Sequence, residues 1–75
     1  MYRKKIMLRP EAVKDFVNAA SKCDFDIDIS YNRICVDAKS IVGVLGLDLG
    51  KVLTVTANGY SEEFDKFLSG LAIAC

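Results

Sequence analysis

The sequence predicts an α+β fold, a two-layer open-faced β-sandwich in which helices cover one face of a four-stranded antiparallel sheet. Two patterns predict it. Segments in which apolar and polar residues alternate are typical of strands with one solvated face. Segments in which apolar residues recur at i, i+3, i+4 and i+7 indicate helices with one buried stripe. The segments follow one another in the order β-α-β-β-α-β-α, so we expect a single domain over residues 1–75.

The first strand is expected over residues 2–8, and a helix follows from Pro10. Proline suits the first helical position, and Glu11 suits the positive end of the helix dipole. The helix closes at Ser21-Lys22. Its predicted buried stripe consists of Val13, Phe16, Val17 and Ala20.

Residues 24–31 alternate over their whole length and predict a second strand, with three aspartates on its solvated face. Alternate strand residues lie about 6.6 Å apart, which is too far for these carboxylates to hold one metal ion by themselves. A turn at Asn32-Arg33 and a returning strand over residues 34–38 follow. A two-residue type I′ turn would hold Arg33 at positive φ, at a cost of about 1 kcal/mol, and a wider turn is the alternative.

The fourth strand is expected over residues 52–57, with Leu53, Val55 and Ala57 facing inward. Ser61 then caps a last helix whose first turn is acidic. The predicted stripe of this helix consists of Phe64, Phe67, Leu68 and Leu71, and residues 72–74 extend its apolar end.

Between two strands, residues 39–51 open with Lys39-Ser40, continue with a short, nearly uncharged apolar run and end in an Asp-Leu-Gly-Lys turn. Ser40 is placed to cap a helix that carries Ile41, Val44 and Leu45 on one face. Gly43 and Gly46 each weaken this helix by roughly 1 kcal/mol, so it should be short. Two interpretations follow: a capped core helix, or a docking surface beside a serine that can be phosphorylated.

Composition limits the classes of function. Lysine and arginine balance aspartate and glutamate at ten each, which argues against general affinity for nucleic acid or an anionic membrane. No apolar run approaches the roughly 20 residues of a membrane span. The apolar N-terminal run ends at Arg9-Pro10, too early for a signal peptide. We therefore expect a cytoplasmic protein.

The chain contains no histidine. This absence excludes Ser-His-Asp and Cys-His catalysis, histidine-ligated metal sites and any phosphohistidine relay. The three cysteines, Cys23, Cys35 and Cys75, match no metal-binding spacing. We expect no enzymatic activity, no cofactor and no metal site.

The sequence resembles HPr, the small phosphocarrier protein of the bacterial sugar phosphotransferase system, over nearly its whole length. The order of strands and helices also fits that family. The most specific block is Lys-Ser-Ile-x-Gly-Val at residues 39–44. The other blocks that carry the resemblance are Arg9-Pro10, Ala20-Ser21-Lys22 and the Thr-Val-Thr-Ala-Asn-Gly run at residues 54–59.

In HPr, a histidine two residues before the Arg-Pro pair accepts and passes on a phosphoryl group. Here the Arg-Pro pair places Met7 at that position, and an alignment on Ala20-Ser21-Lys22 places Arg9 there. Neither side chain can carry the group, because methionine has no protonatable nitrogen and arginine stays protonated. The resemblance therefore implies a member of the family that is not a histidine phosphocarrier.

Ser40 matches the serine that a kinase phosphorylates in many Gram-positive members of the family. The resemblance implies a regulatory protein whose partners are a catabolite-control repressor, HPr kinase or sugar-system enzymes. The alternative is a binding or assembly module that has lost both phosphorylation functions. Either reading leaves the oligomeric state open. The expected protein-binding residues are Arg9, Ile41, Val44, Leu45 and Leu47.

Overall fold

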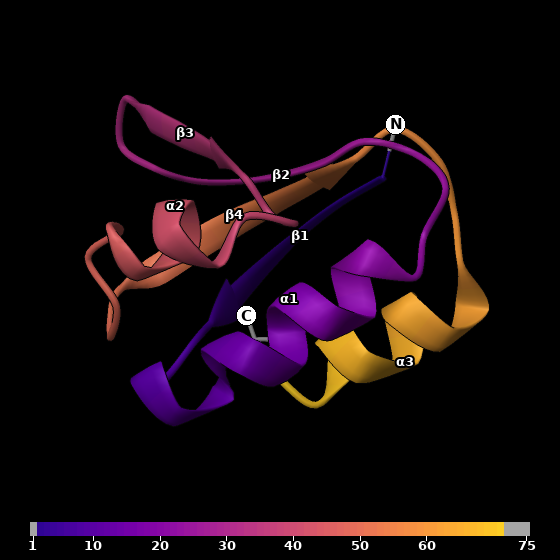
Figure 1. The fold of residues 1–75 in the computed structure, drawn as a ribbon, viewed down its shortest axis with the longest axis horizontal. Coiled ribbons are helices and arrows are strands. Elements are labelled where there is room, and N and C mark those ends of the chain that lie inside the picture. The colour runs from indigo at the N-terminus through magenta and orange to yellow at the C-terminus, as the bar shows by residue number, and fades with distance from the viewer. Residues whose placement is uncertain (1, 72–75) are drawn as a thin grey trace.

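The computed structural model describes residues 2–71 and arranges them in two layers (Figure 1). The strands form one antiparallel sheet in the order β1-β4-β2-β3. The two longer helices lie side by side on one face of it (Figure 1). The predicted fold class is confirmed. The predicted extension over residues 72–74, and Cys75, lie outside the described residues.

The elements follow the predicted order, with a 3₁₀ turn, η1, at the start of the first helix. The strands are β1 (Tyr2–Met7), β2 (Ile27–Tyr31), β3 (Ile34–Asp37) and β4 (Val52–Ala57). The helical elements are η1 (Pro10–Ala12), α1 (Val13–Ser21), α2 (Ile41–Leu45) and α3 (Glu62–Ser69). No helix within residues 2–71 is both long enough and apolar enough to cross a membrane.

One apolar core lies between the sheet and the helices. The stripe predicted for α1 is fully part of it, and the rings of Phe16 and Phe64 meet at 6.2 Å between centroids. The stripe predicted for α3 is buried at Phe64 and Leu68 but only partly at Phe67 and Leu71. The inward residues predicted for β4 are all buried.

The second strand is shorter than the alternation predicts. Asp24 and Phe25 lie in bends, Asp26 has no regular structure, and β2 begins at Ile27. Phe25 nevertheless remains partly buried, because its ring packs against Gly59. A Cβ atom at Gly59 would lie 2.6 Å from this ring, so only glycine allows the contact. The alternation of apolar and polar residues therefore continues before the start of β2, because Phe25 still packs against the core.

The β2–β3 hairpin has a two-residue turn, since Tyr31 pairs with Ile34. Asn32 takes the positive φ, at 55°, and Arg33 does not. The positive φ that a type I′ turn would give Arg33 is therefore not observed, and neither is the wider turn. The turn instead places left-handed backbone at asparagine, a residue type that tolerates it.

Candidate functional site

Ser40 caps α2 as predicted. Its backbone is extended, and its Oγ accepts a hydrogen bond from the Gly43 N–H at 3.2 Å. A Cβ atom at Gly43 would come within 3.3 Å of the Val36 Cβ, so this glycine lets α2 pack closely on β3. The first turn of α2 holds no acidic residue.

The polar groups of Asp37 and Lys39, next to Ser40, already form hydrogen bonds within the protein. The Asp37 carbonyl accepts from the Ser40 N–H at 3.0 Å, and Asp37 Oδ1 accepts from the Lys39 N–H at 2.9 Å. Lys39 Nζ donates to the Cys23 carbonyl at 2.8 Å, which ties this turn to the end of α1. Two positive groups therefore lie next to Ser40 in the sequence: the N-terminal end of α2 and the ammonium group of Lys39. The ammonium group is already bonded to the Cys23 carbonyl.

Three apolar side chains of α2 are exposed, and we call them the α2 face: Ile41 at 42%, Val42 at 79% and Leu45 at 53%. Val44 is 0% exposed and Leu47 is buried, so both must be removed from the predicted binding residues. The helix has only five residues, and it turns Val44 into the core. Leu47 follows the helix end and also belongs to the core, whereas Ile41 and Leu45 stay exposed.

An open hollow of about 480 Å³ lies where β1 ends and η1 begins. Met7 and Arg9, the two positions predicted from the resemblance to match the family's histidine, both line it. Met7 pairs with Val52 of β4, and each is about half exposed. The Met7 N–H donates to the Leu71 carbonyl at 3.1 Å, which joins this end of β1 to the segment after α3.

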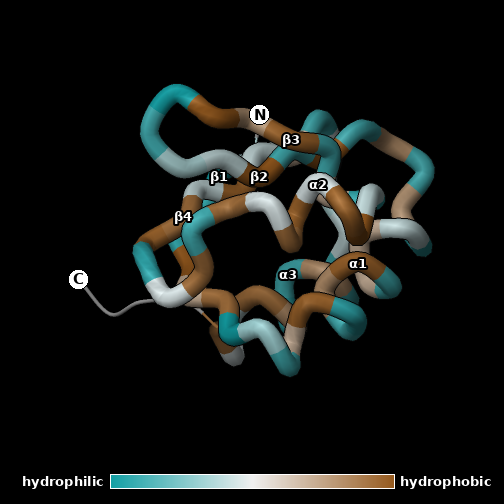
Figure 2. Tube along the Cα trace, turned by 60° about the vertical axis from the view of Figure 1, so that its left-hand side comes forward, coloured by the Kyte–Doolittle hydropathy of each residue, from teal (hydrophilic) through white to brown (hydrophobic). Residues whose placement is uncertain are grey.

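The hollow and the α2 face belong to the same side of the molecule. Gly50 lines the hollow, and the loop that contains it runs from the end of α2 to the start of β4. Gly50 has a φ of 92°, which favours glycine at this turn. In Figure 1, α2, this loop and η1 all lie on the left. Figure 2 brings that side forward and shows apolar stretches in α2 and at the start of β4.

A polar cluster at the other end of β1 was not predicted from the sequence. Asp65 of α3 accepts hydrogen bonds from Tyr2, from Lys4 Nζ at 3.2 Å and from Tyr60 at 3.4 Å. These bonds hold the pKa of Asp65 below its usual value, and the bond from Tyr2 has the largest effect. Burial, followed by the bond to Asp65, raises the pKa of Tyr2. The cluster anchors β1 to α3, and no local pattern connects residues so far apart.

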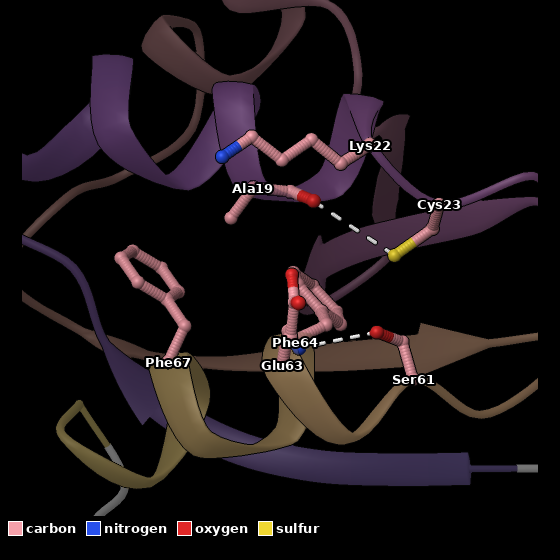
Figure 3. A pocket seen from close by; sticks show the side chains of 7 residues that line it. All are labelled: Ala19, Lys22, Cys23, Ser61, Glu63, Phe64 and Phe67. Carbon is pink, nitrogen blue, oxygen red and sulfur yellow. Dashed lines mark hydrogen bonds between the residues drawn. The ribbon is translucent and has the colours of Figure 1, made fainter.

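A second hollow, of about 250 Å³, separates the end of α1 from the start of α3 (Figure 3). Cys23 lines it, and its Sγ contacts the Ala19 carbonyl at 3.8 Å. Lys22 and Glu63 lie at the same hollow. Within residues 2–71, no three cysteine, aspartate or glutamate side chains converge on a point that could hold a metal ion.

Comparison with known proteins identifies the family. A family model described as "PTS HPr component phosphorylation site" matches residues 5–71. The crystal structure of HPr-C-His from Thermoanaerobacter tengcongensis is 31% identical, with a TM-score of 0.76, and the match covers 96% of this chain and 91% of that one. The phosphocarrier protein HPr from Bacillus anthracis str. Ames is 26% identical, with a TM-score of 0.73 and 93% of each chain covered. The chain therefore belongs to the HPr family of the phosphotransferase system.

Proposed function

We propose that this protein is a regulatory, protein-binding member of the HPr family that does not carry a phosphoryl group on histidine, and that phosphorylation of Ser40 controls its binding. The observation that carries the proposal is the α2 face: three exposed apolar side chains on the helix that Ser40 caps. Solvent exposure of large apolar side chains in a cluster is typical of a surface that binds another protein.

The exclusion of histidine transfer rests on composition and on the side chains at the hollow. The chain has no histidine, and Met7 and Arg9 occupy the two candidate positions. A thioether has no N–H or O–H to exchange for a phosphoryl group, and a guanidinium stays protonated at physiological pH. The hollow can therefore receive a partner's side chain but cannot pass on phosphate.

Ser40 is suited to act as a switch because of what surrounds its hydroxyl. A phosphate adds about 1.5 to 2 negative charges at pH 7, and a helix N-terminus stabilises such a charge. The first turn of α2 has no carboxylate to oppose it. The new charge would stand beside the apolar α2 face, so it would favour partners that combine an apolar contact with an arginine or lysine. A catabolite-control repressor, HPr kinase and sugar-system enzymes are the candidate partners.

An alternative function also has a specific observation in its favour. Lys39, the cation next to Ser40, is engaged with the Cys23 carbonyl, and Asp37 contributes a carboxylate to the same turn. Both features reduce the attraction of this turn for phosphate. They favour a binding or assembly module that uses the α2 face without any phosphorylation.

Incubation with HPr kinase and ATP, followed by intact-mass measurement, distinguishes the phosphorylation switch from the binding module without phosphorylation. We expect the mass of one added phosphoryl group, no addition to Ser40→Ala, and unchanged addition to Ser61→Ala, which removes the other serine cap. An unmodified wild-type protein, or a mass gain that survives Ser40→Ala, would contradict the switch and leave the binding module.

The binding surface is tested separately, by affinity measurements on a candidate partner with the folded variants Val42→Asp and Ile34→Asp. Both replace an exposed apolar residue with a carboxylate, but only Val42 belongs to the α2 face. We expect Val42→Asp to weaken binding about tenfold or more, and Ile34→Asp to have little effect. Equal losses would argue against the α2 face.

A further inference from the structure

The two edges of the sheet differ in their protection against pairing with another strand. β1 and β3 are the edge strands. β1 carries Arg3, Lys4 and Lys5, and Lys4 forms an ion pair with Asp65 of α3. Charged residues of this kind, lysine above all, prevent edge-to-edge association. β3 instead presents Ile34, which is 56% exposed, together with an exposed Cys35 and a partly exposed Val36.

The register of the hairpin shows which backbone groups of β3 face outward. Tyr31 and Ile34 flank a two-residue turn and are directly paired, as are Ile29 and Val36. Such flanking residues exchange both backbone hydrogen bonds, and the pairs alternate along an antiparallel ladder. Cys35 therefore directs its N–H and C=O away from β2. In Figure 1, β3 lies at the top of the molecule, far from α1 and α3, so these helices do not cover its edge.

The residues of this edge are complementary to themselves. Residues 33–37 read Arg-Ile-Cys-Val-Asp, which places a cation at one end, a carboxylate at the other and apolar residues between. Suppose that a second copy of the strand lies antiparallel to the first, with Cys35 facing Cys35. Ile34 of each copy then faces Val36 of the other, and Arg33 of each copy faces Asp37 of the other. Opposite charges and apolar pairs at facing positions stabilise a sheet.

The sheet also contains a like-charge pair at this edge. Asp28 of β2 lies directly opposite Asp37 of β3. Two carboxylates at facing positions destabilise a sheet. In the antiparallel arrangement, Arg33 of the second copy would approach Asp37 from the free side and offset this repulsion. The favoured occupant of the edge is therefore a strand with a cation at this position, which a second copy of the chain supplies.

We propose that this protein self-associates through β3, forming a two-fold symmetric dimer in which the two sheets become continuous and Cys35 lies on the symmetry axis. The interface is short and falls in the class of weak contacts that bury less than about 1,200 Å². The dimer therefore forms in concentrated solution and dissociates on dilution. This association is independent of the proposed role of Ser40.

Sedimentation at increasing protein concentration under reducing conditions tests the proposal with charge reversals. We expect Arg33→Asp and Asp37→Arg each to weaken the dimer about tenfold or more, because each removes two facing pairs and creates two like-charge pairs. The double variant restores the opposite charges and should recover most of the association. Arg3→Asp makes the same charge change on the β1 edge and should leave the dimer intact.

A thiol measurement locates the symmetry axis. In a Cys75→Ser background, diamide takes up two electrons and two protons as two Cys35 thiols form one disulfide. Facing residues of a hydrogen-bonded pair have Cα atoms about 5.5 Å apart, which suits a disulfide. We expect covalent dimers that disappear in Cys35→Ser, while Cys35→Ser still dimerises under reducing conditions.

Two results would overturn the proposal. One is a wild-type protein that remains monomeric at the highest concentration that stays soluble. The other is a dimer that Arg3→Asp weakens and Arg33→Asp does not, which would assign the contact to the β1 edge. Circular dichroism of every variant verifies that a lost dimer is not a lost fold.

Discussion

Ser40 and Ser61 begin two helices with nearly the same geometry. Both have extended backbones, and their Oγ atoms accept from the N–H three residues on at 3.2 and 3.3 Å, as Figure 3 shows for Ser61. The residues behind the two caps differ. α3 has Glu62, Glu63 and Asp65 in its first turn, whereas α2 has no carboxylate there and exposes apolar side chains.

This comparison shows that the same serine cap begins helices whose charge and exposure differ. The cap satisfies a backbone N–H in both cases, so it cannot distinguish a regulatory serine from a structural one. The charge and exposure behind the cap can distinguish them. Three carboxylates oppose an added phosphate at Ser61, and none does so in the first turn behind Ser40.

The largest expected effect separates the buried and exposed sides of α2. Val44→Asp places a carboxylate in the core and should destabilise the protein by about 4 kcal/mol or more, enough to unfold a small domain. Leu45→Asp, its exposed neighbour, should change stability by about 0.5 kcal/mol. Urea denaturation measures both. Similar losses would mean that α2 does not pack as described.

The next effect tests whether the two caps are equivalent for folding. Ser40→Ala and Ser61→Ala should each lower the free energy of unfolding by about 1 kcal/mol, because each leaves one helix N–H without its acceptor. Urea denaturation at neutral pH compares them. A much larger loss at Ser40 would show that its hydroxyl does more for folding than cap a short helix.

A smaller effect compares the electrostatics behind the caps. Aspartate caps a helix about as well as serine, so Ser40→Asp should be nearly neutral for stability. Ser61→Asp adds a charge beside Glu62 and Glu63 and should be less stable than Ser40→Asp by about 0.5 kcal/mol. Added salt should narrow the gap. A gap that salt does not change would contradict this electrostatic explanation.

The smallest effect concerns pH and the acidic first turn of α3. The pKa of Asp65 is lower in the folded protein than its ordinary value. Its contribution is therefore present above the ordinary carboxyl pKa and is lost as pH falls through the lower folded value. Denaturation between about pH 6 and pH 2 should show a step that Asp65→Asn removes and Glu63→Gln retains. An unchanged step in Asp65→Asn would assign it to other carboxylates.

Sequence alone predicted the features that depend on residues within one turn or one strand. The two serine caps, the limits of β4 and the α1 stripe follow from local hydrogen bonding and from the helix and strand periods. The family resemblance extended this to the whole fold. The predictions for residues 24–26 and for the exposure of α2 were inaccurate because packing against distant residues sets the structure there. The error at Arg33 is local, because the turn places its positive φ on Asn32.

The sequence by itself determined the helix and strand pattern, the caps and the absence of histidine from the chain. Those features rest on composition and on neighbours along the chain. Only the tertiary structure decided that Val44 and Leu47 turn into the core while Val42 stays exposed. It alone also joined Tyr2 to Asp65 and placed β3 at an edge of the sheet. The physical reason is that burial, clusters of charge and edge positions depend on how distant segments pack, which no local period encodes.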